Sequence, residues 1–335
     1  MKAAVFYGSR DIRVEEVATP GLEAGEVLIR VRACGICGSD LHPYKLGEFA
    51  AVATPCGAGQ IMGHEFSGEI AELGGQVEGL KVGDRVVTVS GGANAEYLRI
   101  PAMMRPIVIP LPPEVSYEEA ATNEPLATSL HAVNLAEPTD GETIVILGAG
   151  IIGLGVLQVL KARCSAKVIV TDLSDKRLAM AQELGAEVVI NAAREDPYKK
   201  MLEMTGSTPL MFMEEWPMSS VDTVFDCAGM AAEHIGEPPM WQALLMLKEN
   251  GKLVLVAIYE KPVEIEYNII VRKGIKLFGS WGWQFDEFLQ ALELIRSGKV
   301  DRKPLITHEF PLDRAKEAYE TQLKAEESIK VLLKP

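Results

Sequence analysis

A buried strand that leads into a glycine-rich turn constrains this chain more than any other feature of its sequence. Residues 143–147 form a continuous apolar run, which is typical of a strand in a parallel sheet covered on both faces. The run leads into Gly148-Ala149-Gly150-Ile151-Ile152-Gly153, and a helical pattern follows to about Cys164. This order predicts the first strand–turn–helix unit of a doubly wound α/β sheet.

Strands and helices continue to alternate further along the chain. Alternation of this kind predicts a parallel sheet with helices on its faces. The expected elements are strands at residues 167–172, 187–190, 221–225 and 252–258, and a helix at 175–184 that stops at Gly185. Residues 205–220 interrupt the alternation, and we expect a surface insertion there, with a subunit or substrate contact as the alternative.

The first 110 residues have a different character, because glycine and proline break them into short β segments. No long helical pattern appears before Ser116. After the α/β region, helices are expected at 286–297 and 315–324 and a closing strand at 329–333. We therefore expect a β-rich domain over residues 1–126, an α/β domain over 127–279, and a return to the first domain over 280–335.

Composition and charge exclude several classes of protein. The 335 residues are 48% hydrophobic and 24% charged, which is ordinary for a globular protein. A net charge of −14 argues against nucleic acid and anionic membranes as partners. The longest apolar runs, such as residues 253–258, are too short to span a bilayer. Five irregularly spaced cysteines and no signal-peptide pattern favour the reducing cytoplasm.

The glycine turn predicts a dinucleotide site. Gly148 permits the tight turn, Gly150 lets the backbone approach a pyrophosphate, and Gly153 lets helix and strand pack closely. Asp172 ends the second strand, where its carboxylate would accept hydrogen bonds from ribose and repel a 2′-phosphate, so we predict NAD rather than NADP. The alternative is that the glycines only mark a turn and that Asp172 caps a helix.

Other residues complete the predicted cofactor site. Arg177 either covers the adenosine edge or lies on a solvated helix face. The remaining expected contacts are Ile151, Ile152, Cys227 and Val256.

Three residues of the β-rich region have the chemistry of a metal site. Cys37 and His64 are expected in loops, and Glu124 just before a helix. A thiolate, an imidazole and a carboxylate leave a fourth position on zinc for water or substrate, which is the catalytic arrangement. Zinc there would polarise a substrate oxygen and stabilise an alkoxide.

Each of these residues also has a simpler interpretation. Cys37 could be a small buried hydrophobe, His64 a core histidine, and Glu124 a charge favoured at a helix N-terminus. Cys34 and Cys37 also form a C-x-x-C pair, which occurs in redox and zinc-knuckle motifs. The sequence has no second such pair, and the flanking residues differ from the thioredoxin pattern.

The chain resembles the medium-chain zinc-dependent alcohol dehydrogenases, and most closely the branch of sorbitol, threonine and 2,3-butanediol dehydrogenases. The resemblance implies a GroES-like catalytic domain with an inserted Rossmann domain, one that assembles as a homodimer or homotetramer. The segments that carry it are Lys2-Ala3-Ala4-Val5, Gly35-Ile36-Cys37-Gly38-Ser39-Asp40-Leu41-His42, Gly63-His64-Glu65-Phe66-Ser67-Gly68-Glu69, Gly83-Asp84-Arg85-Val86, Glu124-Pro125-Leu126, the glycine turn and Phe225-Asp226-Cys227-Ala228-Gly229.

The resemblance implies a role for each residue of the metal site. Cys37 and His64 correspond to zinc ligands, and Glu124 occupies the position that some members fill with a second cysteine. Glu65 corresponds to an acid beside the ligands that can move onto the metal. Asp40 corresponds to the carboxylate that orients His64.

The resemblance also implies a path for the substrate proton. Ser39 would take the proton and pass it through the ribose to His42 and solvent.

One departure from the family is large. Members usually carry a lobe with four closely spaced cysteines, but here residues 88–97 run straight on, with no cysteine between Cys56 and Cys164. We therefore expect one catalytic zinc and no structural zinc. Cys56 is expected to be a passive loop residue, although it could approach the metal.

Together these features predict an NAD-dependent enzyme that interconverts a small secondary alcohol or polyol and its ketone. A zinc-free quinone or enoyl reductase on the same fold is one alternative, and a non-catalytic NAD-binding protein is another. Position alone suggests four substrate-pocket candidates, Tyr44, Phe49, Trp281 and Trp283. Residues 274–279 are expected to form the edge through which subunits pair.

Overall fold

The computed structural model describes residues 1–47, 56–210, 213–231, 234 and 236–335. The chain forms two compact units, one made of Met1–Pro125 with Phe288–Pro335 and the other of Leu126–Glu287. The boundaries expected from the sequence were at residues 126 and 279. No helix in the described part of the chain is long and apolar enough to cross a bilayer.

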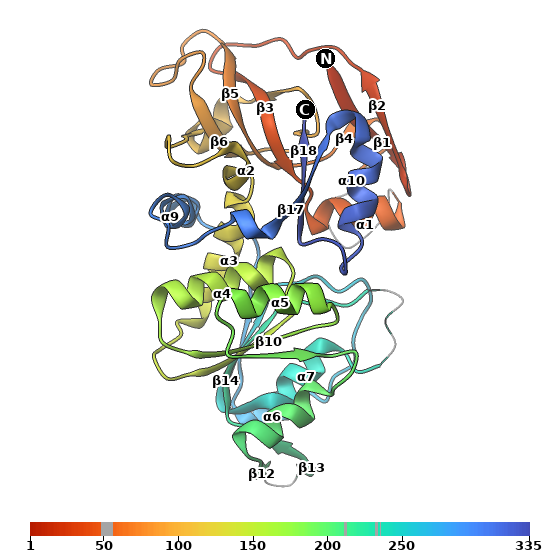
Figure 1. Ribbon diagram of the computed structural model, residues 1–335, viewed down its shortest axis with the longest axis vertical. Coiled ribbons are helices and arrows are strands. Elements are labelled where there is room, and N and C mark those ends of the chain that lie inside the picture. Colours follow the sequence, from red (N-terminus) through yellow and green to blue (C-terminus); the bar gives the residue numbers. More distant parts are fainter. Residues whose placement is uncertain (48–55, 211–212, 232–233, 235) are drawn as a thin grey trace. The chain divides into compact units, whose positions relative to one another are not determined.

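The second unit is built on a six-stranded sheet in which every pairing is parallel. The strand order is β11-β10-β9-β14-β15-β16 (Figure 1). The first strand therefore lies beside the fourth, and this reversal creates a crevice at the carboxyl ends of β9 and β14. The strands are β9 (Thr143–Leu147), β10 (Lys167–Asp172), β11 (Val188–Asn191), β14 (Val221–Asp226), β15 (Leu247–Leu255) and β16 (Lys276–Gly279).

Helices connect these strands, and their apolar residues form a common core with the sheet. Val145, Val224 and Leu253, on three neighbouring strands, are fully buried in one cluster. Burial of each such side chain stabilises the fold by roughly 1.5–3 kcal/mol. The helices are α3 (Asn123–Ala136), α4 (Ile151–Arg163), α5 (Asp175–Glu183), α6 (Pro197–Thr205), α7 (Pro239–Met246) and α8 (Asn268–Lys273). The predicted doubly wound sheet is confirmed.

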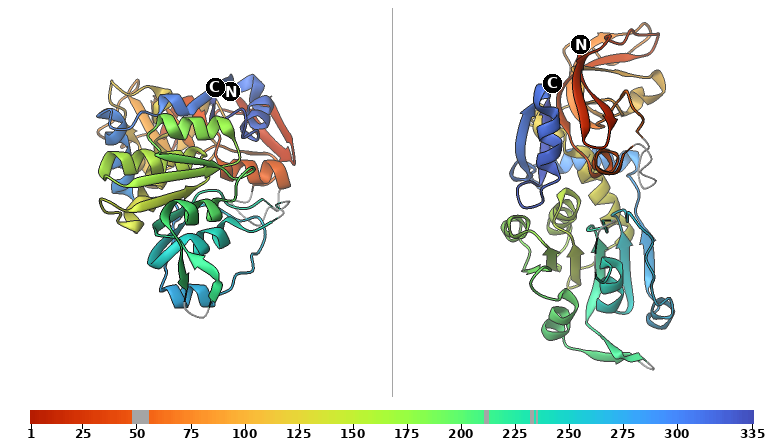
Figure 2. Two further views of the ribbon diagram at one scale, coloured as in Figure 1. Left: turned by 60° about the horizontal axis from the view of Figure 1, so that its bottom comes forward. Right: turned by 90° about the vertical axis from the view of Figure 1, so that its right-hand side faces the viewer.

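The interruption at residues 205–220 contains an antiparallel hairpin, β12 (Thr208–Leu210) with β13 (Met213–Met218). Figure 2 shows the hairpin extending away from the parallel sheet. Its base is anchored in the core of the unit, because the ring of Trp216 meets that of Trp241 edge-on at 5.3 Å. The insertion is therefore packed against α7 through Trp216.

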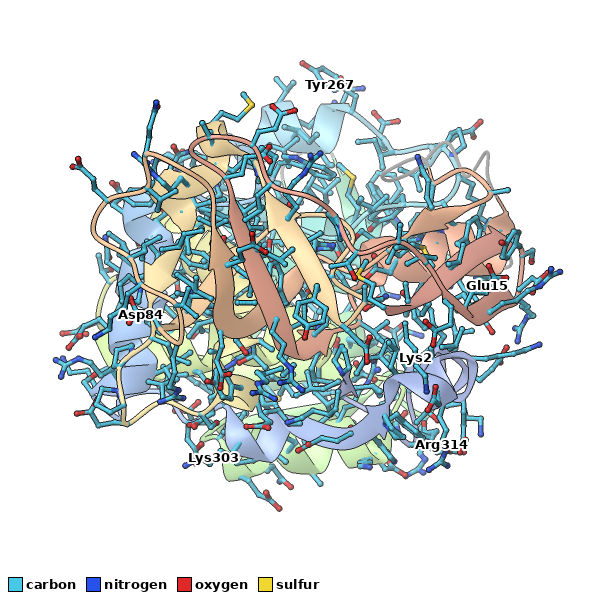
Figure 3. All side chains as sticks on the ribbon, turned by 90° about the horizontal axis from the view of Figure 1, so that it is seen from above. Lys2, Glu15, Asp84, Tyr267, Lys303 and Arg314 are labelled. Carbon is cyan, nitrogen blue, oxygen red and sulfur yellow. The ribbon has the colours of Figure 1, made fainter. Side chains whose placement is uncertain are left out.

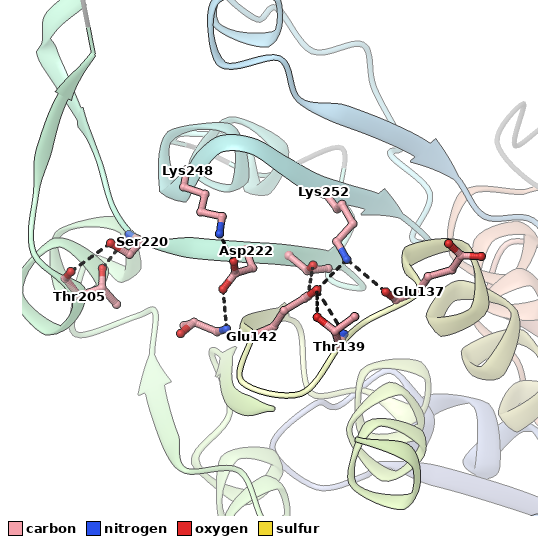
Figure 4. A network of polar contacts seen from close by, with 10 residues as sticks. Glu137, Thr139, Glu142, Thr205, Ser220, Asp222, Lys248 and Lys252 are labelled. Atoms are coloured by element: carbon pink, nitrogen blue, oxygen red, sulfur yellow. Dashed lines mark hydrogen bonds and ion pairs between the residues drawn. The ribbon is translucent and has the colours of Figure 1, made fainter. Parts of the chain in front are cut away.

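A polar network closes the amino-terminal end of the sheet (Figure 4). Lys252 Nζ donates to Glu142 Oε1 at 2.9 Å and to the carbonyl of Ala136, near the end of α3, at 2.8 Å. The other oxygen of Glu142 accepts from Thr223 Oγ1 at 2.9 Å. These bonds join one helix end to two strands, so Lys252 supports the packing of several elements.

Replacing Lys252 by methionine is expected to lower the free energy of unfolding by about 2 kcal/mol. The change leaves the largely buried Glu142 carboxylate without its cation, and removal of one partner of such a pair is costly. Urea unfolding measures the difference. Lys248→Met is the matched control, because its half-exposed pair with Asp222 should contribute less than about 1 kcal/mol. Equal losses in the two variants would contradict this assignment.

The first unit has a seven-stranded sheet in which the two last strands of the chain join five strands of its first 110 residues. Six strands follow the order β17-β18-β3-β5-β6-β8, and β7 also pairs with β3. Figure 1 shows the blue C-terminal strand β18 beside β3, with which it pairs. The strands are β3 (Val27–Gly35), β5 (Glu65–Leu73), β6 (Arg85–Val89), β7 (Tyr97–Ile100), β8 (Ile109–Pro110), β17 (Ile306–Pro311) and β18 (Lys330–Lys334).

A smaller three-stranded sheet and several helices complete this unit. The sheet order is β2-β1-β4. Its strands are β1 (Lys2–Gly8), β2 (Asp11–Glu16) and β4 (Gln60–Ile61), and the helices are α1 (Gly38–Leu46), α2 (Tyr117–Ala120), α9 (Phe285–Arg296) and α10 (Ala315–Gln322), with 3₁₀ turns at Ala102–Ile107, Lys303–Leu305 and Leu312–Arg314.

Helix α1 is a short helix of the first unit that the sequence analysis did not identify. Cys37 is the N-cap residue of this helix. The helix contains Gly38 and Pro43 and lacks an apolar stripe of helical period, so no periodic signal marks it in the sequence. Glu124 likewise lies within the first turn of α3, one residue inside the helix rather than before it.

Candidate metal and cofactor sites

Three potential metal ligands converge in the first unit. The ligand atoms of Cys37, His64 and Glu65 all lie within 4.8 Å of one another, and no other such group of three occurs among the described residues. The antiparallel pairing of β3 with β5 sets Gly35 opposite Glu65. This register brings the end of one strand, with Cys37 two residues later, to the start of the other.

Asp40 supports this group from the first turn of α1. Its Oδ2 accepts from the N–H of Cys37 at 3.0 Å, its Oδ1 accepts from the N–H of Gly63 at 3.2 Å, and Oδ1 lies 3.8 Å from Nδ1 of His64. Burial opposes ionisation of Asp40, but His64 and the two N–H groups outweigh it and lower its pKa below the ordinary value. The resulting carboxylate is placed to orient the His64 ring.

The donor set fits a zinc ion. Burial raises the pKa of the Cys37 thiol, with a further contribution from Glu65, so a thiolate there calls for a nearby cation. Glu65 Oε1 is buried and has no hydrogen-bond partner among the described residues. A sulfur, an imidazole nitrogen and an unsatisfied carboxylate oxygen are ligands that zinc accepts, with a fourth position left over.

Glu124 and Cys56 are not part of this group. Glu124 is carried by a separate element, α3. Cys56 is buried in an apolar cluster with Met62, so the possibility that it approaches the metal is not supported.

The proposed proton path begins on α1. Ser39 and His42 are both half-buried and are separated by three positions on the helix, so their side chains lie on the same side of it.

The glycine turn has the close contacts that its sequence predicts. Gly148 has a φ of 91°, and a Cβ there would lie 2.8 Å from the backbone N of Ala228. A Cβ on Gly153 would overlap the carbonyl oxygen of Gly148. A Cβ on Gly150 would meet only the Arg177 guanidinium, at 3.9 Å. Gly148 and Gly153 are thus required by packing, whereas Gly150 leaves open space above the turn.

The remaining predicted cofactor residues gather at the carboxyl end of the same sheet. Asp172 accepts from the N–H of Ala149 at 2.6 Å, within the turn. Cys227 and Val256 directly follow β14 and β15 and hydrogen bond to the neighbouring strand ends. Ile151 and Ile152 begin α4, where the first N–H groups of the helix are available to phosphate oxygens. This edge is where ligands bind to sheets of this order.

The sequence alone did not reveal two residues at these sites. Tyr259 donates to the buried Asp226 at 2.5 Å and accepts from the N–H of Met240 at 2.8 Å, and so links the end of β14 to the first turn of α7. Lys330 forms an ion pair with Glu65. Neither residue has a local signal, because each partner is distant in the chain.

The pocket assignments require a correction. Tyr44 is fully buried, donates to Glu320 at 2.7 Å and packs against Tyr319 at 5.0 Å between ring centroids. Its prediction as a pocket residue is wrong, because it joins α1 to α10. Trp281 is 75% exposed, Trp283 is half-buried, and Phe49 lies outside the described residues.

Comparison with known proteins identifies the family. Residues 152–297 match the zinc-binding dehydrogenase family, and residues 23–113 match the GroES-like domain of alcohol dehydrogenases. The chain is 33% identical to (R,R)-butanediol dehydrogenase of Bacillus subtilis (strain 168) over the full length of both, and 31% identical to sorbitol dehydrogenase of the same organism over 100% of this chain and 97% of that one.

A solved structure shows the same fold. The crystal structure of 2R,3R-butanediol dehydrogenase from Bacillus subtilis superposes with a TM-score of 0.83 at 32% identity, covering 100% of this chain and 99% of that one. The chain belongs to the zinc-dependent alcohol dehydrogenase family. The predicted enzyme class, GroES-like and Rossmann folds, zinc and NAD are thereby confirmed.

Proposed function

We propose that the protein interconverts a small secondary alcohol or polyol and its ketone, with NAD as hydride acceptor or donor. The observation that carries this proposal is the group of Cys37, His64 and Glu65, in which the buried Glu65 carboxylate accepts no hydrogen bond from the described residues, in a chain that also has a dinucleotide-binding turn. The names of the relatives support the substrate class, because they are butanediol and sorbitol dehydrogenases.

Cys37, His64 and Glu65 would hold the zinc, and Glu124 would lie outside the resting ligand set. When bound, zinc polarises the substrate oxygen and stabilises the alkoxide. Asp40 would keep His64 oriented, and Ser39 and His42 would carry the hydroxyl proton of the substrate toward solvent. NAD would supply the hydride acceptor, so that one alcohol and NAD⁺ would give one ketone, NADH and a proton.

A carboxylate among the ligands favours polyols. It is a harder ligand than the thiolate it would replace, and such a site suits a substrate with several oxygen donors. The test is a panel of sorbitol, xylitol, 2,3-butanediol, threonine and 1-butanol with NAD. We expect the highest kcat/KM for a polyol or vicinal diol, and a maximum for 1-butanol would rule the polyol assignment out. Activity that survives complete zinc removal would favour the quinone-reductase alternative.

Cofactor choice gives a prediction at Asp172. We expect the wild-type enzyme to prefer NAD, because this carboxylate at the end of β10 would repel a 2′-phosphate. Asp172→Ser should weaken the preference by about 10-fold, which is about 1.4 kcal/mol. The ratio of kcat/KM for NAD and NADP measures it. Equal efficiency with both cofactors in the wild-type enzyme would refute the assignment.

The edge strand β16 gives a prediction about assembly. Leu277 on this strand is 44% exposed, and two residues before it are also exposed: Val271 in helix α8 and Tyr267, the N-cap of that helix, which Figure 3 labels. An unpaired apolar edge favours pairing with a second chain. We expect a homodimer or homotetramer by light scattering, which Leu277→Lys should dissociate. Val82→Lys, at another exposed apolar residue, is the control and should leave the assembly unchanged. A stable wild-type monomer at micromolar concentration would count against this edge.

We also propose that the enzyme works in the cytoplasm. All five cysteines are free thiols, as expected in a reducing compartment.

A further inference from the structure

A buried carboxylate ends β14, at the edge of the parallel sheet where the dinucleotide site is expected. Asp226 is 0% exposed. Its Oδ2 accepts from the hydroxyl of Tyr259 at 2.5 Å, and its Oδ1 accepts from the N–H groups of Ala228 at 3.2 Å and Gly229 at 3.3 Å. Burial raises the pKa of Asp226 above its ordinary value, and these hydrogen bonds oppose that shift. A carboxylate in such a place is costly unless donors satisfy it, and here three donors do so.

Through its side chain, Asp226 holds the turn after β14 in a crowded position. A Cβ on Gly148 would lie 2.8 Å from the backbone N of Ala228, so this turn contacts the glycine turn directly. Gly229 has a φ of 64°, and a Cβ there would lie 2.5 Å from the carbonyl oxygen of Ile258. The turn after β14 is therefore enclosed between the glycine turn and the segment after β15.

Tyr259 connects the segment after β15 to the same carboxylate. The N–H groups of Val256 and Ala257 donate to the backbone carbonyl of Asp226, both at 3.0 Å. The hydroxyl of Tyr259 then bonds to the Asp226 side chain and accepts from the N–H of Met240, in the first turn of α7, at 2.8 Å. One tyrosine hydroxyl thus joins the end of β14, the segment after β15 and the start of α7.

The strand order indicates which part of the cofactor these segments face. In a sheet of this order, each half of three strands binds one mononucleotide. The glycine turn follows β9 and Asp172 ends β10, so β9, β10 and β11 would receive the adenosine half. The nicotinamide half falls to β14, β15 and β16. Cys227 and Val256 lie on the two segments that Asp226 and Tyr259 join.

We propose that Asp226 and Tyr259 are positioning residues that fix the nicotinamide half of the cofactor site before the cofactor binds. The pair holds the segments after β14 and β15 in a single arrangement, so less conformational entropy is lost when the cofactor binds. The adenosine half, carried by β9 and β10, does not depend on this pair. This inference rests on the proposed NAD site.

Removing the tyrosine hydroxyl should weaken one half of the site only. Tyr259→Phe takes the donor from Asp226 Oδ2 and the acceptor from the N–H of Met240, so the segment after β15 gains freedom. We expect the Kd for NADH to rise at least about 10-fold, the effect of losing one hydrogen bond to a charged group. The Kd for AMP, which carries only the adenosine half, should stay at the wild-type value.

The test is a calorimetric titration of the full-length, zinc-loaded wild-type protein and the Tyr259→Phe variant with NADH and with AMP. The ratio of the two Kd values is the decisive quantity. A tyrosine that only supported the fold of the unit would leave this ratio unchanged, because both ligands would be affected alike or not at all.

Tyr198→Phe is the matched control. The hydroxyl of Tyr198 donates to the carbonyl of Pro217 at 2.6 Å within the same unit. Pro217 precedes the first residue of β14, whereas Asp226 is the last residue of that strand. The control therefore removes a hydrogen-bonded tyrosine hydroxyl at the opposite end of β14. Its Kd values for NADH and AMP should both equal those of the wild-type protein.

Hydrogen–deuterium exchange of the wild-type protein decides the question if Tyr259→Phe does not fold. The segments after β14 and β15 should be protected from exchange in the cofactor-free protein, and NADH should add little protection. Free exchange of these segments until NADH is added would overturn the proposal. So would an unchanged NADH affinity in Tyr259→Phe, or an equal loss for NADH and AMP. A wild-type protein that binds no NADH would instead refute the proposed NAD site, so the two failures are distinguishable.

Discussion

Replacing Cys37 or His64 by alanine is expected to remove the bound zinc and to lower kcat/KM by at least about 1,000-fold, or about 4 kcal/mol of transition-state stabilisation. Each change deletes one of the three ligand atoms that lie within 4.8 Å of one another, and two remaining ligands hold the metal poorly. Elemental analysis and initial rates with the best alcohol of the panel provide the measurements.

The same experiment has an internal control for folding. The dinucleotide site lies in the unit Leu126–Glu287, which has its own core, so both variants should still bind NADH with wild-type affinity by fluorescence. Cys56→Ala removes a thiol from the apolar cluster beside Met62 and should keep its zinc. The wild-type protein should contain one zinc per chain. Two tightly held zincs per chain would contradict the assignment of a single site.

The variants Gly150→Ala and Gly153→Ala are expected to impair different properties, NADH binding in the first and stability in the second. Gly150 has a φ of −73°, which alanine adopts freely, and its new methyl group would meet only the Arg177 guanidinium at 3.9 Å. The free protein should keep its stability, but the methyl group would occupy the space that the pyrophosphate needs. We expect the Kd for NADH to rise by about 100-fold, or about 2.7 kcal/mol.

Gly153→Ala should instead damage the fold of the unit. Its methyl group would overlap the carbonyl oxygen of Gly148, so α4 would have to move away from β9. Overpacking of this kind costs typically 1–3 kcal/mol and sometimes more. Thermal unfolding and NADH titration of both variants separate the two effects. A destabilised Gly150→Ala protein, or a Gly153→Ala protein as stable as wild type, would show that the roles of the two glycines are misassigned.

Local sequence patterns were sufficient to predict most strands and helices of the second unit. Strand β9 has the bounds predicted from its apolar run, and the strands and helices after it follow the predicted alternation. Short-range physics explains this success, because a buried parallel strand must be apolar along its length and its crossover helix must have one apolar face. The glycine turn was also recognisable from its sequence, although its steric demands are only partly local: a Cβ on Gly153 would overlap Gly148, whereas a Cβ on Gly148 would meet the distant Ala228.

Local patterns failed where the chain has no periodicity or where the partner is distant. Helix α1 contains Gly38 and Pro43 and has no apolar stripe, yet tertiary contacts hold it, because Tyr44 is bonded to Glu320 in α10. The same long-range hydrogen bond explains why Tyr44 is not a pocket residue. Its position in the sequence suggested that Tyr44 lines the substrate pocket, whereas in the structure its side chain joins α1 to α10.

The sequence by itself determined the kind of chemistry: a thiol, an imidazole and carboxylates in one region, and a dinucleotide turn in another. Only the tertiary structure decided which carboxylate joins Cys37 and His64. The pairing of β3 with β5 brings Glu65 into the group, while Glu124 is carried on a separate helix. The pairing of β18 with β3 then adds Lys330, which no local pattern connects with Glu65. Sheet register joins residues that are far apart in the chain, and its physical basis lies in hydrogen bonds between strands rather than in the neighbouring sequence.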